Sequence, residues 1–305
     1  MSGRVCAIVV TYNRRVPLRA GLLALGAQTR PPDALLVVDN ASDDGTRALL
    51  RAEFPGATVL ALAANGGGAG GFHAGMRWAY GRGFEWLWVM DDDARPAPDC
   101  LEKLLAHAPP GGVAIPVQQD SGGRRYGIAV WRGQEVDVTA GVVAKQPPVY
   151  GDFLFRFVGP LIAREIVARV GLPNKDFFIW FDDLEYALRI HGQPKIEGQA
   201  EMETVAVPDA RFFHDFGGKY REARLLWRRS VRNQQPAWKL YYGARNHLYT
   251  LIRGRHDHRE LLTFLRGEVR FIIGEMLYEP DRWERVRMRL LGYRDGVIGR
   301  LGKRI

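Results

Sequence analysis

The sequence predicts an α/β protein built on a mostly parallel sheet. Short apolar runs of strand length alternate with stretches whose apolar residues recur at helical spacing, and short polar connections join them. Four of these runs, at residues 5–10, 34–38, 58–62 and 86–90, are followed closely by polar side chains. Strands that alternate with helices pair in parallel through right-handed crossovers, so we expect the polar ends to meet along one edge of the sheet.

The helices of the first half follow from the spacing of apolar residues. Leucines from Leu18 to Leu25 form a helical stripe after the first strand, and a turn after the second strand leads into another helix. After the third strand comes a glycine run, and we expect a helix over residues 72–81. This helix leads back to the strand at 86–90.

The second half is less regular. Residues 113–117, 125–131 and 136–142 indicate short strands, and residues 162–170 indicate a helix. The aromatic stretch 177–181 (Phe-Phe-Ile-Trp-Phe) predicts a strand that runs into a further helix. Beyond it, the spacing is helical to the end of the chain. We therefore expect a body over residues 1–220 and a helical carboxyl-terminal region over residues 221–305.

The net charge of +9 is concentrated at the carboxyl terminus. Residues 221–305 contain 20 Lys and Arg against 9 Asp and Glu. A basic region can serve nucleic acid, anionic lipid or a phosphorylated substrate. Two cysteines without a disulfide or zinc spacing indicate a reducing compartment. The apolar run at the start of the sequence, which ends at Val10, is too short for a signal peptide, and no apolar run is long enough to span a membrane. We therefore expect a cytoplasmic protein.

The most informative stretch is the acidic end of the fourth strand, Asp91, Asp92 and Asp93. Three adjacent carboxylates repel one another, and folding alone gives no reason for them. Side chains at i and i+2 of an extended segment point the same way, so Asp91 and Asp93 can share one divalent cation while Asp92 faces elsewhere. The alternative is a solvated acidic turn. The position beyond a strand's carboxyl end favours the metal site.

A glycine motif nearby resembles a dinucleotide-binding loop. Gly66, Gly68 and Gly71 satisfy G-x-G-x-x-G between a strand and a helix, with Asp91 about twenty residues on. However, the loop follows the third strand, the acidic triplet would repel a pyrophosphate, and two other polar strand ends converge on the same edge. We interpret the glycines instead as residues that let the backbone approach a ligand closely.

Three segments taken together resemble glycosyltransferase family 2, whose GT-A fold is a Rossmann-like nucleotide-sugar-binding domain. They are residues 9–13 (Val-Val-Thr-Tyr-Asn), 37–46 and 90–94. The glycine segment 65–72 and the Asp-Asp-Asp form of the acidic motif are most similar to the galactofuranosyltransferase branch, with rhamnosyltransferases as near relatives. The resemblance extends to residues 178–186, to Phe213-His214 and loosely to the motif Tyr-Tyr-Gly-Ala-Arg-Asn at 241–246.

The resemblance implies roles for particular residues. Asp91 and Asp93 would hold Mn²⁺ or Mg²⁺ with His214 as a further ligand, and an imidazole among carboxylates favours Mn²⁺. His214 could equally be a buried, hydrogen-bonded histidine. The residues implied for the UDP or dTDP part of the donor are Thr11, Asp39, Asn65 and Asp92, with Arg14 at the phosphates.

The same resemblance implies the reaction. Asp183, beside Asp182, matches the catalytic base that takes a proton from a hydroxyl of a glycan or lipid-linked glycan acceptor, and a single displacement then inverts the anomeric carbon. An acceptor platform would include Phe157, Trp180 and Phe181, unless these are core residues. The expected donor is UDP-galactofuranose, with dTDP-rhamnose as the alternative.

Two further interpretations concern the basic region. Aromatic and basic residues interleave there, as in a non-catalytic nucleotide or nucleic-acid binder, but no recognised nucleic-acid module is present, so we expect no nucleic-acid partner. Arg282, Arg285 and Arg289 recur at helical spacing beside Trp283, Val286 and Leu290. This pattern predicts peripheral contact with the anionic inner face of the cell membrane, unless the arginines pair with carboxylates. The oligomeric state stays open, a homo-oligomer included.

Overall fold

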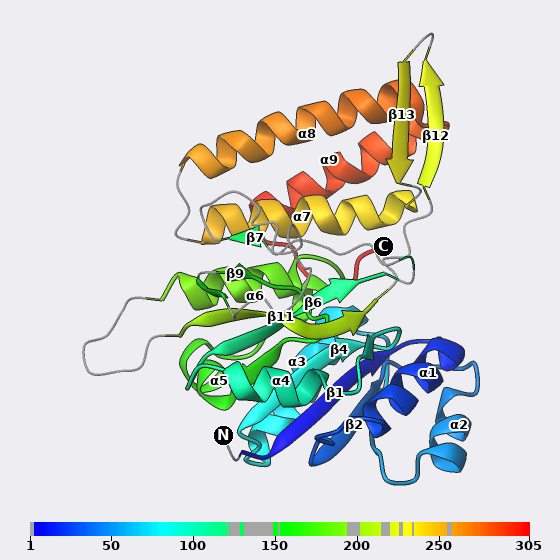
Figure 1. Cartoon of the computed structure of the whole chain (residues 1–305). Coiled ribbons are helices and arrows are strands. Elements are labelled where there is room, and N and C mark those ends of the chain that lie inside the picture. Colours follow the sequence, from blue (N-terminus) through cyan, green and yellow to red (C-terminus); the bar gives the residue numbers. More distant parts are fainter. Residues whose placement is uncertain are drawn as a thin grey trace. The chain divides into compact units, whose positions relative to one another are not determined.

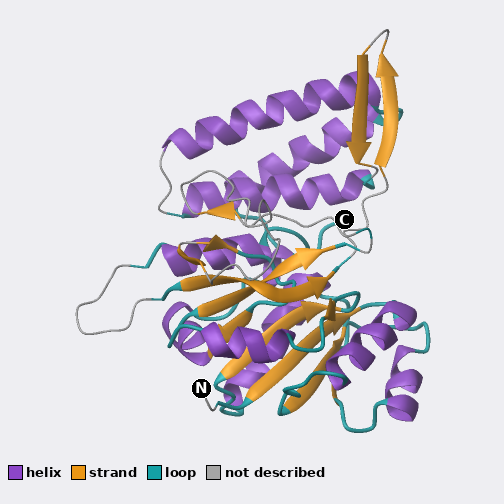
Figure 2. Cartoon of the chain, viewed as in Figure 1, coloured by secondary structure: helices purple, strands orange, loops and turns teal. Residues whose placement is uncertain are grey.

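The structure, a computed structural model, divides into two compact units. It describes residues 3–120, 122, 129–130, 149–151, 153–193, 202–214, 220–225, 228–233, 235–254 and 258–305. The first unit comprises Met1–Lys175 with Asp183–Asp215, and the second comprises Asp176–Asp182 with Phe216–Ile305. Figures 1 and 2 show the elements of each. The expected strands at 125–131 and 136–142 lie almost wholly outside the described residues.

A nine-stranded sheet forms the centre of the first unit. The strands on its main path, in spatial order, are β3 (Thr58–Ala61), β2 (Ala34–Asp39), β1 (Val5–Thr11), β4 (Trp86–Asp91), β10 (Leu161–Ala163), β6 (Val113–Gln119), β11 (Thr204–Phe213) and β5 (Arg95–Pro96). The ninth strand, β8 (Val149–Gly151), pairs with β11, and β7 (Ala129–Val130) pairs separately with β9 (Phe153–Leu154). The pairings of β1, β2, β3 and β4 are parallel, as is that of β6 with β11. The predicted mostly parallel α/β sheet is confirmed.

Strand order reverses between β1 and β4, which sets where a ligand can bind. The helices of this unit are α1 (Arg15–Gly26), α2 (Thr46–Glu53), α3 (Gly67–Gly81), α4 (Cys100–His107), α5 (Arg164–Val170) and most of α6 (Asp182–His191). The chain steps outward through α1 and α2, then returns through α3, so right-handed crossovers place α3 on the opposite face of the sheet. Figure 1 agrees with this arrangement. The reversal creates a crevice at the strands' carboxyl ends, the usual ligand position in such sheets.

The glycine run belongs to a helix rather than to a loop. Helix α3 begins at Gly67, five residues before the predicted start at residue 72. A Cβ at Gly71 would lie 2.3 Å from Val10 Cγ1, and one at Gly75 would lie 2.5 Å from Ile8 Cγ2. These glycines therefore let α3 lie directly on β1, a packing role that the sequence motif does not reveal.

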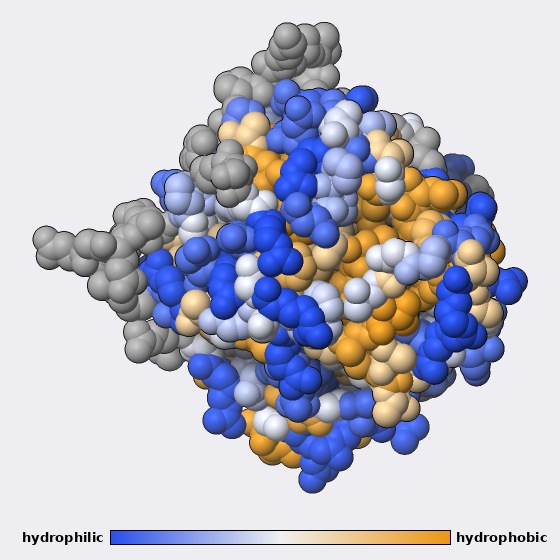
Figure 3. Space-filling view, turned by 90° about the horizontal axis from the view of Figure 1, so that it is seen from below, coloured by the Kyte–Doolittle hydropathy of each residue, from blue (hydrophilic) through white to orange (hydrophobic). Residues whose placement is uncertain are grey.

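The outer surface mixes polar and apolar residues. Figure 3 shows the molecule of Figure 1 as seen from below, with hydrophobic areas among hydrophilic ones. Single exposed apolar side chains on the first unit, such as Val16 and Val59, are normal for a folded surface. The buried core extends through the sheet and the helices of this unit and includes β1 and β4, where Val5–Val10 and Trp86–Met90 are at most 6% exposed.

The second unit contains a hairpin and three helices. The hairpin strands β12 (Tyr220–Leu225) and β13 (Arg228–Asn233) pair in antiparallel fashion, and α7 (Ala237–Arg253), α8 (His258–Tyr278) and α9 (Arg282–Ile298) follow. The helical carboxyl-terminal region is confirmed. The expectation of helix from residue 221 onward is wrong for the hairpin, because its short polar and basic strands carry little apolar periodicity. Within the described chain, no helix is long and apolar enough to cross a membrane.

Two of the three arginines expected to face lipid are buried. Arg285 Nε lies 2.6 Å from Asp281 Oδ1, and Arg289 Nη2 lies 2.8 Å from Glu275 Oε1. Arg289 Nη1 also lies 2.6 Å from Glu268 Oε2. Burial favours arginines that are paired. Arg289 therefore joins α9 to α8, and Arg285 is held at the start of its own helix, so neither belongs to a lipid-facing stripe. The predicted stripe of Arg282, Arg285 and Arg289 is therefore wrong.

The predicted aromatic strand at 177–181 is also wrong. The chain makes a short 3₁₀ turn, η1 (Lys175–Phe177), and then places Phe178, Trp180 and Phe181 in the left-handed region, with φ of 66°, 65° and 72°. Each such non-glycine residue costs on the order of 1–3 kcal/mol. Sequence pattern could not anticipate this conformation, because aromatic residues ordinarily favour strands.

The packing of α3 can be tested with two alanine substitutions in the same helix. Gly75→Ala should destabilise the protein by about 1–3 kcal/mol, because the added methyl group overlaps Ile8 and Val38 in the core. Gly70→Ala is the matched control, since its Cβ meets nothing within 4 Å, and it should stabilise the helix by about 0.5–1 kcal/mol. Thermal unfolding measures both. Equal shifts would show that α3 does not depend on close approach.

Candidate functional site

Four strands bring polar residues to one edge of the sheet. Thr11 at the end of β1 pairs in register with Asp39 at the end of β2, and Val10 pairs with Asp91 at the end of β4. Strand β10 is antiparallel to both β4 and β6, and β11 is parallel to β6, so β11 runs in the same direction as β4. His214 follows the last residue of β11. The short strand β5 pairs with that end, so the turn after Asp91 lies beside His214.

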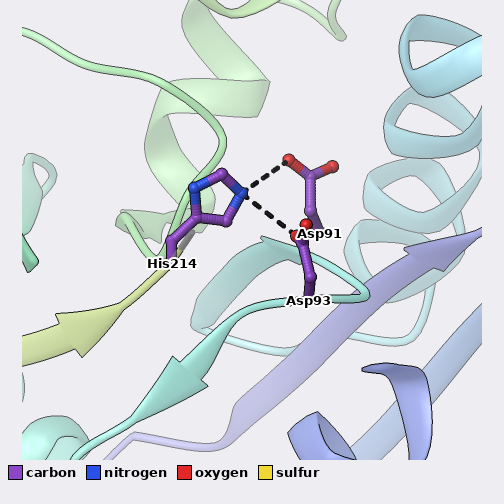
Figure 4. Close-up of side chains that lie close together, drawn as sticks. All are labelled: Asp91, Asp93 and His214. Carbon is purple, nitrogen blue, oxygen red and sulfur yellow. Dashed lines mark ion pairs between the residues drawn. The ribbon is translucent and has the colours of Figure 1, made fainter. Parts of the chain in front are cut away.

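Asp91, Asp93 and His214 form a compact cluster (Figure 4). His214 Nε2 lies 3.1 Å from Asp93 Oδ1 and 4.0 Å from Asp91 Oδ2, and one ligand atom of each residue lies within 4.8 Å of the others. Ligands about 2.1 Å from one ion at right angles lie about 3 Å apart, so this donor set fits a divalent cation. His214 is only 8% exposed, but its ring faces the carboxylates.

The charges of the cluster stabilise one another. Burial opposes the ionised form of Asp93, but the hydrogen bond and charge of His214, together with Arg14, hold the pKa of Asp93 below its usual range. Burial likewise lowers the pKa of His214, but Asp93 and then Asp91 outweigh it, so the pKa of His214 is raised. The protein alone therefore favours an ion pair where a cation would otherwise sit.

The middle carboxylate, Asp92, points into the protein. It is 4% exposed, accepts a hydrogen bond of 2.7 Å from Thr11 Oγ1 and lies 3.4 Å from Arg14 Nε. Burial raises the pKa of Asp92 to about 6, although Arg14 and Thr11 act in the opposite direction. Asp92 thus holds Thr11 and Arg14 in place. Arg14 also reaches Asp93 Oδ2 at 2.8 Å and lines a hollow of about 300 Å³ beyond the end of β1.

The remaining nucleotide candidates lie at the ends of β2 and β3. Asp39 is fully buried, accepts a hydrogen bond from the Ser42 backbone N–H and is paired with Arg47. Asn65 follows β3 and accepts a hydrogen bond of 2.7 Å from the Gly67 backbone N–H at the start of α3. Sequence reasoning missed Arg47, because a single arginine eight residues after a strand end carries no recognisable signal.

Asp183 lies in the first unit, on the first turn of α6. Its Oδ1 accepts a hydrogen bond of 2.7 Å from the Leu184 backbone N–H, and the Phe157 backbone N–H also donates to its carboxylate. Burial raises the pKa of Asp183, against the opposing effects of these bonds and of the Arg156 charge. A carboxylate with a raised pKa is a better proton acceptor, as a general base requires.

The three aromatic candidates differ. Phe157 is 2% exposed, and its ring centroid lies 4.8 Å from that of Phe72 and 5.9 Å from that of Tyr186, so its ring is core. Of the two alternatives for Phe157, the structure favours a core residue over an acceptor contact, and its backbone N–H donates to Asp183. Trp180 and Phe181 are half-buried and belong, with Asp182, to the second unit.

Comparisons with known proteins agree with this architecture. Residues 6–134 match the family described as Glycosyl transferase family 2. The chain is 31% identical over 318 residues to the galactofuranosyltransferase GlfT1 of Mycobacterium tuberculosis, with 97% of each covered. It is 33% identical over 196 residues to GlfT1 of Mycolicibacterium smegmatis, covering 61% of the chain and 65% of that protein. The dTDP-rhamnosyl transferase RfbF of Shigella flexneri is 24% identical, with 99% of the chain and 98% of RfbF covered.

A solved structure shares the fold at low sequence identity. The mannosyltransferase PcManGT of Pyrobaculum calidifontis, in complex with GDP-Man and Mn²⁺, aligns with a TM-score of 0.55 at 16% identity. The alignment covers 98% of the chain and 88% of PcManGT. The expected GT-A type of fold is confirmed. With a full-length relative at 31% identity and the family match over the sheet, the chain belongs to glycosyltransferase family 2, in the branch that includes galactofuranosyl- and rhamnosyltransferases.

Proposed function

We propose that this glycosyltransferase is an inverting, metal-dependent enzyme that moves a sugar from a nucleotide sugar to a hydroxyl of a glycan or lipid-linked glycan. The observation that carries the proposal is the cluster of Asp91, Asp93 and His214 at the ligand-binding edge of the sheet. Asp183, with its raised pKa, lies in the same unit. When bound at the cluster, Mn²⁺ or Mg²⁺ supplies positive charge that stabilises the diphosphate as it leaves.

The protein's own residues carry the remaining steps. Thr11, Asp39, Asn65 and Asp92 form the edge that receives the nucleotide, and Arg14 offers a guanidinium for its phosphates. Asp183 takes the proton of the acceptor hydroxyl while the hydroxyl oxygen bonds to the anomeric carbon. The bond from that carbon to the diphosphate oxygen breaks on the opposite side, so the configuration inverts.

We assign UDP-galactofuranose as donor, with dTDP-rhamnose as the alternative. The two GlfT1 relatives at 31% and 33% identity support the first, and RfbF at 24% supports the second. A panel of nucleotide sugars and octyl glycosides, assayed for metal-dependent release of the nucleoside diphosphate, separates the two. Turnover with dTDP-rhamnose alone would reverse the assignment. Tight oligonucleotide binding without turnover would favour the non-catalytic alternative.

The metal assignment predicts the effect of removing a ligand. Asp93→Ala and His214→Ala should each abolish sugar transfer and remove the Mn²⁺-dependent increase in melting temperature with UDP. Asp43→Ala, which removes an exposed acid outside the cluster, is the control and should change neither. Unchanged Mn²⁺ affinity in both ligand variants, measured by electron paramagnetic resonance, would place the ion elsewhere.

The base assignment predicts a loss of activity without a loss of stability. Asp183→Asn cannot accept a proton, so transfer should fall about a hundredfold or more while donor affinity is kept. Because its pKa is raised, Asp183 keeps its proton in the native state at pH values where the unfolded chain, with a pKa of about 3.9, has already lost it. Ionisation of Asp183 therefore lowers the free energy of unfolding as pH rises above about 4. The variant should therefore be at least as stable as wild type at pH 7, with the difference disappearing below about pH 4.

Asp182→Asn is the comparison variant for the base. Asp182 is 6% exposed and adjacent to Asp183. It should retain most of the transfer activity. A larger loss of turnover in Asp182→Asn than in Asp183→Asn would reverse the roles of the pair.

We also propose that the enzyme is cytoplasmic and binds anionic membrane peripherally, through α8 rather than α9. The side of α8 that faces α9 carries Glu268 and Glu275, which are paired with Arg289. Its outer side exposes apolar residues at helical spacing, namely Leu262, Leu265, Val269 and Ile273. Helix α8 therefore buries Phe264 and Glu275 but leaves this apolar stripe exposed, whereas the apolar side of an ordinary surface helix faces the core.

The charges beside this apolar stripe favour a lipid surface. Arg266 and Arg270 line a shallow groove of about 360 Å³ together with Leu262, Leu265 and Val269. A second copy of α8 laid on the stripe would bring like charges together, whereas anionic headgroups would pair with them. Each basic residue near such a surface contributes about 1 kcal/mol, and apolar burial adds to it.

Co-sedimentation with liposomes tests the membrane proposal. Binding should be strong to vesicles that contain phosphatidylglycerol, weak to pure phosphatidylcholine and reduced by salt. It should be lost in Arg266→Glu/Arg270→Glu and reduced in Leu262→Ser/Val269→Ser. Arg51→Glu/Arg77→Glu changes the same charge on exposed helix positions of the first unit and is the control. Indifference to lipid charge, or an equal loss in the control, would contradict the proposal.

A further inference from the structure

The segment 177–181 has a conformation that its own sequence does not favour. Phe178, Trp180 and Phe181 all lie in the left-handed region, where a side chain crowds the backbone. Three such residues within four positions persist only where the surroundings hold them, and such strain concentrates at functional sites. The segment ends at Asp182, where α6 begins, and the next residue is Asp183.

One buried amide holds the backbone of this segment. Asn246 on α7 is 0% exposed, and its Nδ2 lies 3.0 Å from the carbonyl oxygen of Phe177, 3.1 Å from that of Ile179 and 2.8 Å from that of Trp180. Its Oδ1 accepts a hydrogen bond of 2.8 Å from Arg245 Nε, so the amide nitrogen must face the segment. The two N–H bonds of this group are shared among the three carbonyl oxygens, and a carboxylate, which has no donor, cannot replace them.

Arg245 adds a second set of donors from the same helix. It is also 0% exposed, its Nη2 lies 2.9 Å from the Phe177 carbonyl oxygen, and its Nη1 lies 2.6 Å from the Gly302 carbonyl oxygen. Burial lowers the pKa of Arg245, which shows that the position is costly for a cation. A buried guanidinium directed at main-chain carbonyls joins the segment to the carboxyl-terminal residues.

The aromatic side chains of the segment rest on the same helix. The Phe178 ring lies 5.0 Å from that of Tyr242, and the Phe181 ring stacks on His247 at 4.2 Å. A Cβ at Gly243 would lie 3.0 Å from Trp180 Cε3, so glycine leaves room for the indole. The motif Tyr-Tyr-Gly-Ala-Arg-Asn at 241–246 therefore contacts the segment through four of its six residues.

We propose that Asn246 and Arg245 are positioning residues for the acceptor side of the reaction. They hold the segment 177–181, so that Trp180 and Phe181 form a fixed platform three and two residues before Asp183 in the chain. This inference rests on the proposed function, in which Asp183 is the base. The acceptor class it implies is a sugar, whose apolar C–H face stacks on an aromatic ring.

The test separates transfer from donor binding. In Asn246→Asp and Asn246→Ala, transfer to the octyl glycoside that wild type uses best should fall on the order of 100-fold, since small misplacements have such effects. Mn²⁺-dependent binding of UDP should change less than about threefold, because Asp91, Asp93 and His214 belong to the other unit. Hydrolysis of the donor by water should likewise persist.

The matched control is Thr250→Val, one turn further along α7. Thr250 is buried and donates a hydrogen bond of 2.8 Å to the Asn246 carbonyl oxygen, so its replacement removes one buried hydrogen bond without touching the segment. This variant should keep wild-type transfer. If it loses transfer as Asn246→Ala does, or if UDP binding falls together with transfer in the Asn246 variants, the residues have only a general structural role and the proposal is wrong.

Chymotrypsin provides a readout that does not depend on activity. Released from Asn246, the segment should be cut after Phe178, Trp180 or Phe181 at least tenfold faster than in wild type or Thr250→Val, with the sites identified by mass spectrometry. Unchanged cleavage in both Asn246 variants would overturn the proposal. If wild type transfers no sugar from any donor, the proposed function fails, but the cleavage comparison still tests whether Asn246 holds the segment.

Discussion

Repulsion among three consecutive carboxylates at the end of β4 is the constraint on which this site depends. Asp91 ends the buried strand β4, and the turn after it leaves the side chains of Asp92 and Asp93 only 5% and 16% exposed, so water alone cannot screen the three charges. The protein separates them. Asp92 turns inward to Thr11 and Arg14, while Asp91 and Asp93 turn together toward His214. Thr11, Arg14 and His214 thereby stabilise, through hydrogen bonds and opposite charge, carboxylates that burial alone would disfavour.

Much of the first unit could be predicted because its signals are local. Apolar runs and polar strand ends depend on neighbouring residues, and the parallel topology follows from their order. The grouping of Asp91 with Asp93 was expected from strand alternation, yet the strand ends at Asp91 and a turn places Asp93. His214 joins them through the long-range pairing of β5 with β11. The spacing of residues does not predict this pairing, and only the family resemblance indicated His214.

What could not be predicted depends on contacts between distant segments. The sequence 177–181 has the composition of a strand, but donors on α7, 66 to 69 residues further along the chain, hold its backbone in the left-handed region. Arg285 and Arg289 have the spacing of a surface stripe, but acids on α8 and near its end pair with them in the interior. Hydrophobic periodicity identifies a helix and its two sides. It does not tell which side finds a partner when the buried side is charged.

Asp93 and Asp183 differ in their pKa because their surroundings differ, and this difference fits the roles proposed for them. Asp93 sits beside His214 and Arg14, so its pKa is lowered and it stays a carboxylate that a cation can use. At Asp183, desolvation outweighs the backbone hydrogen bonds and the charge of Arg156, so its pKa is raised. An enzyme that must hold a metal and also remove a proton needs acids of both kinds. Exchanging the two environments would give a metal ligand that protonates too easily and a base too weak to accept a proton.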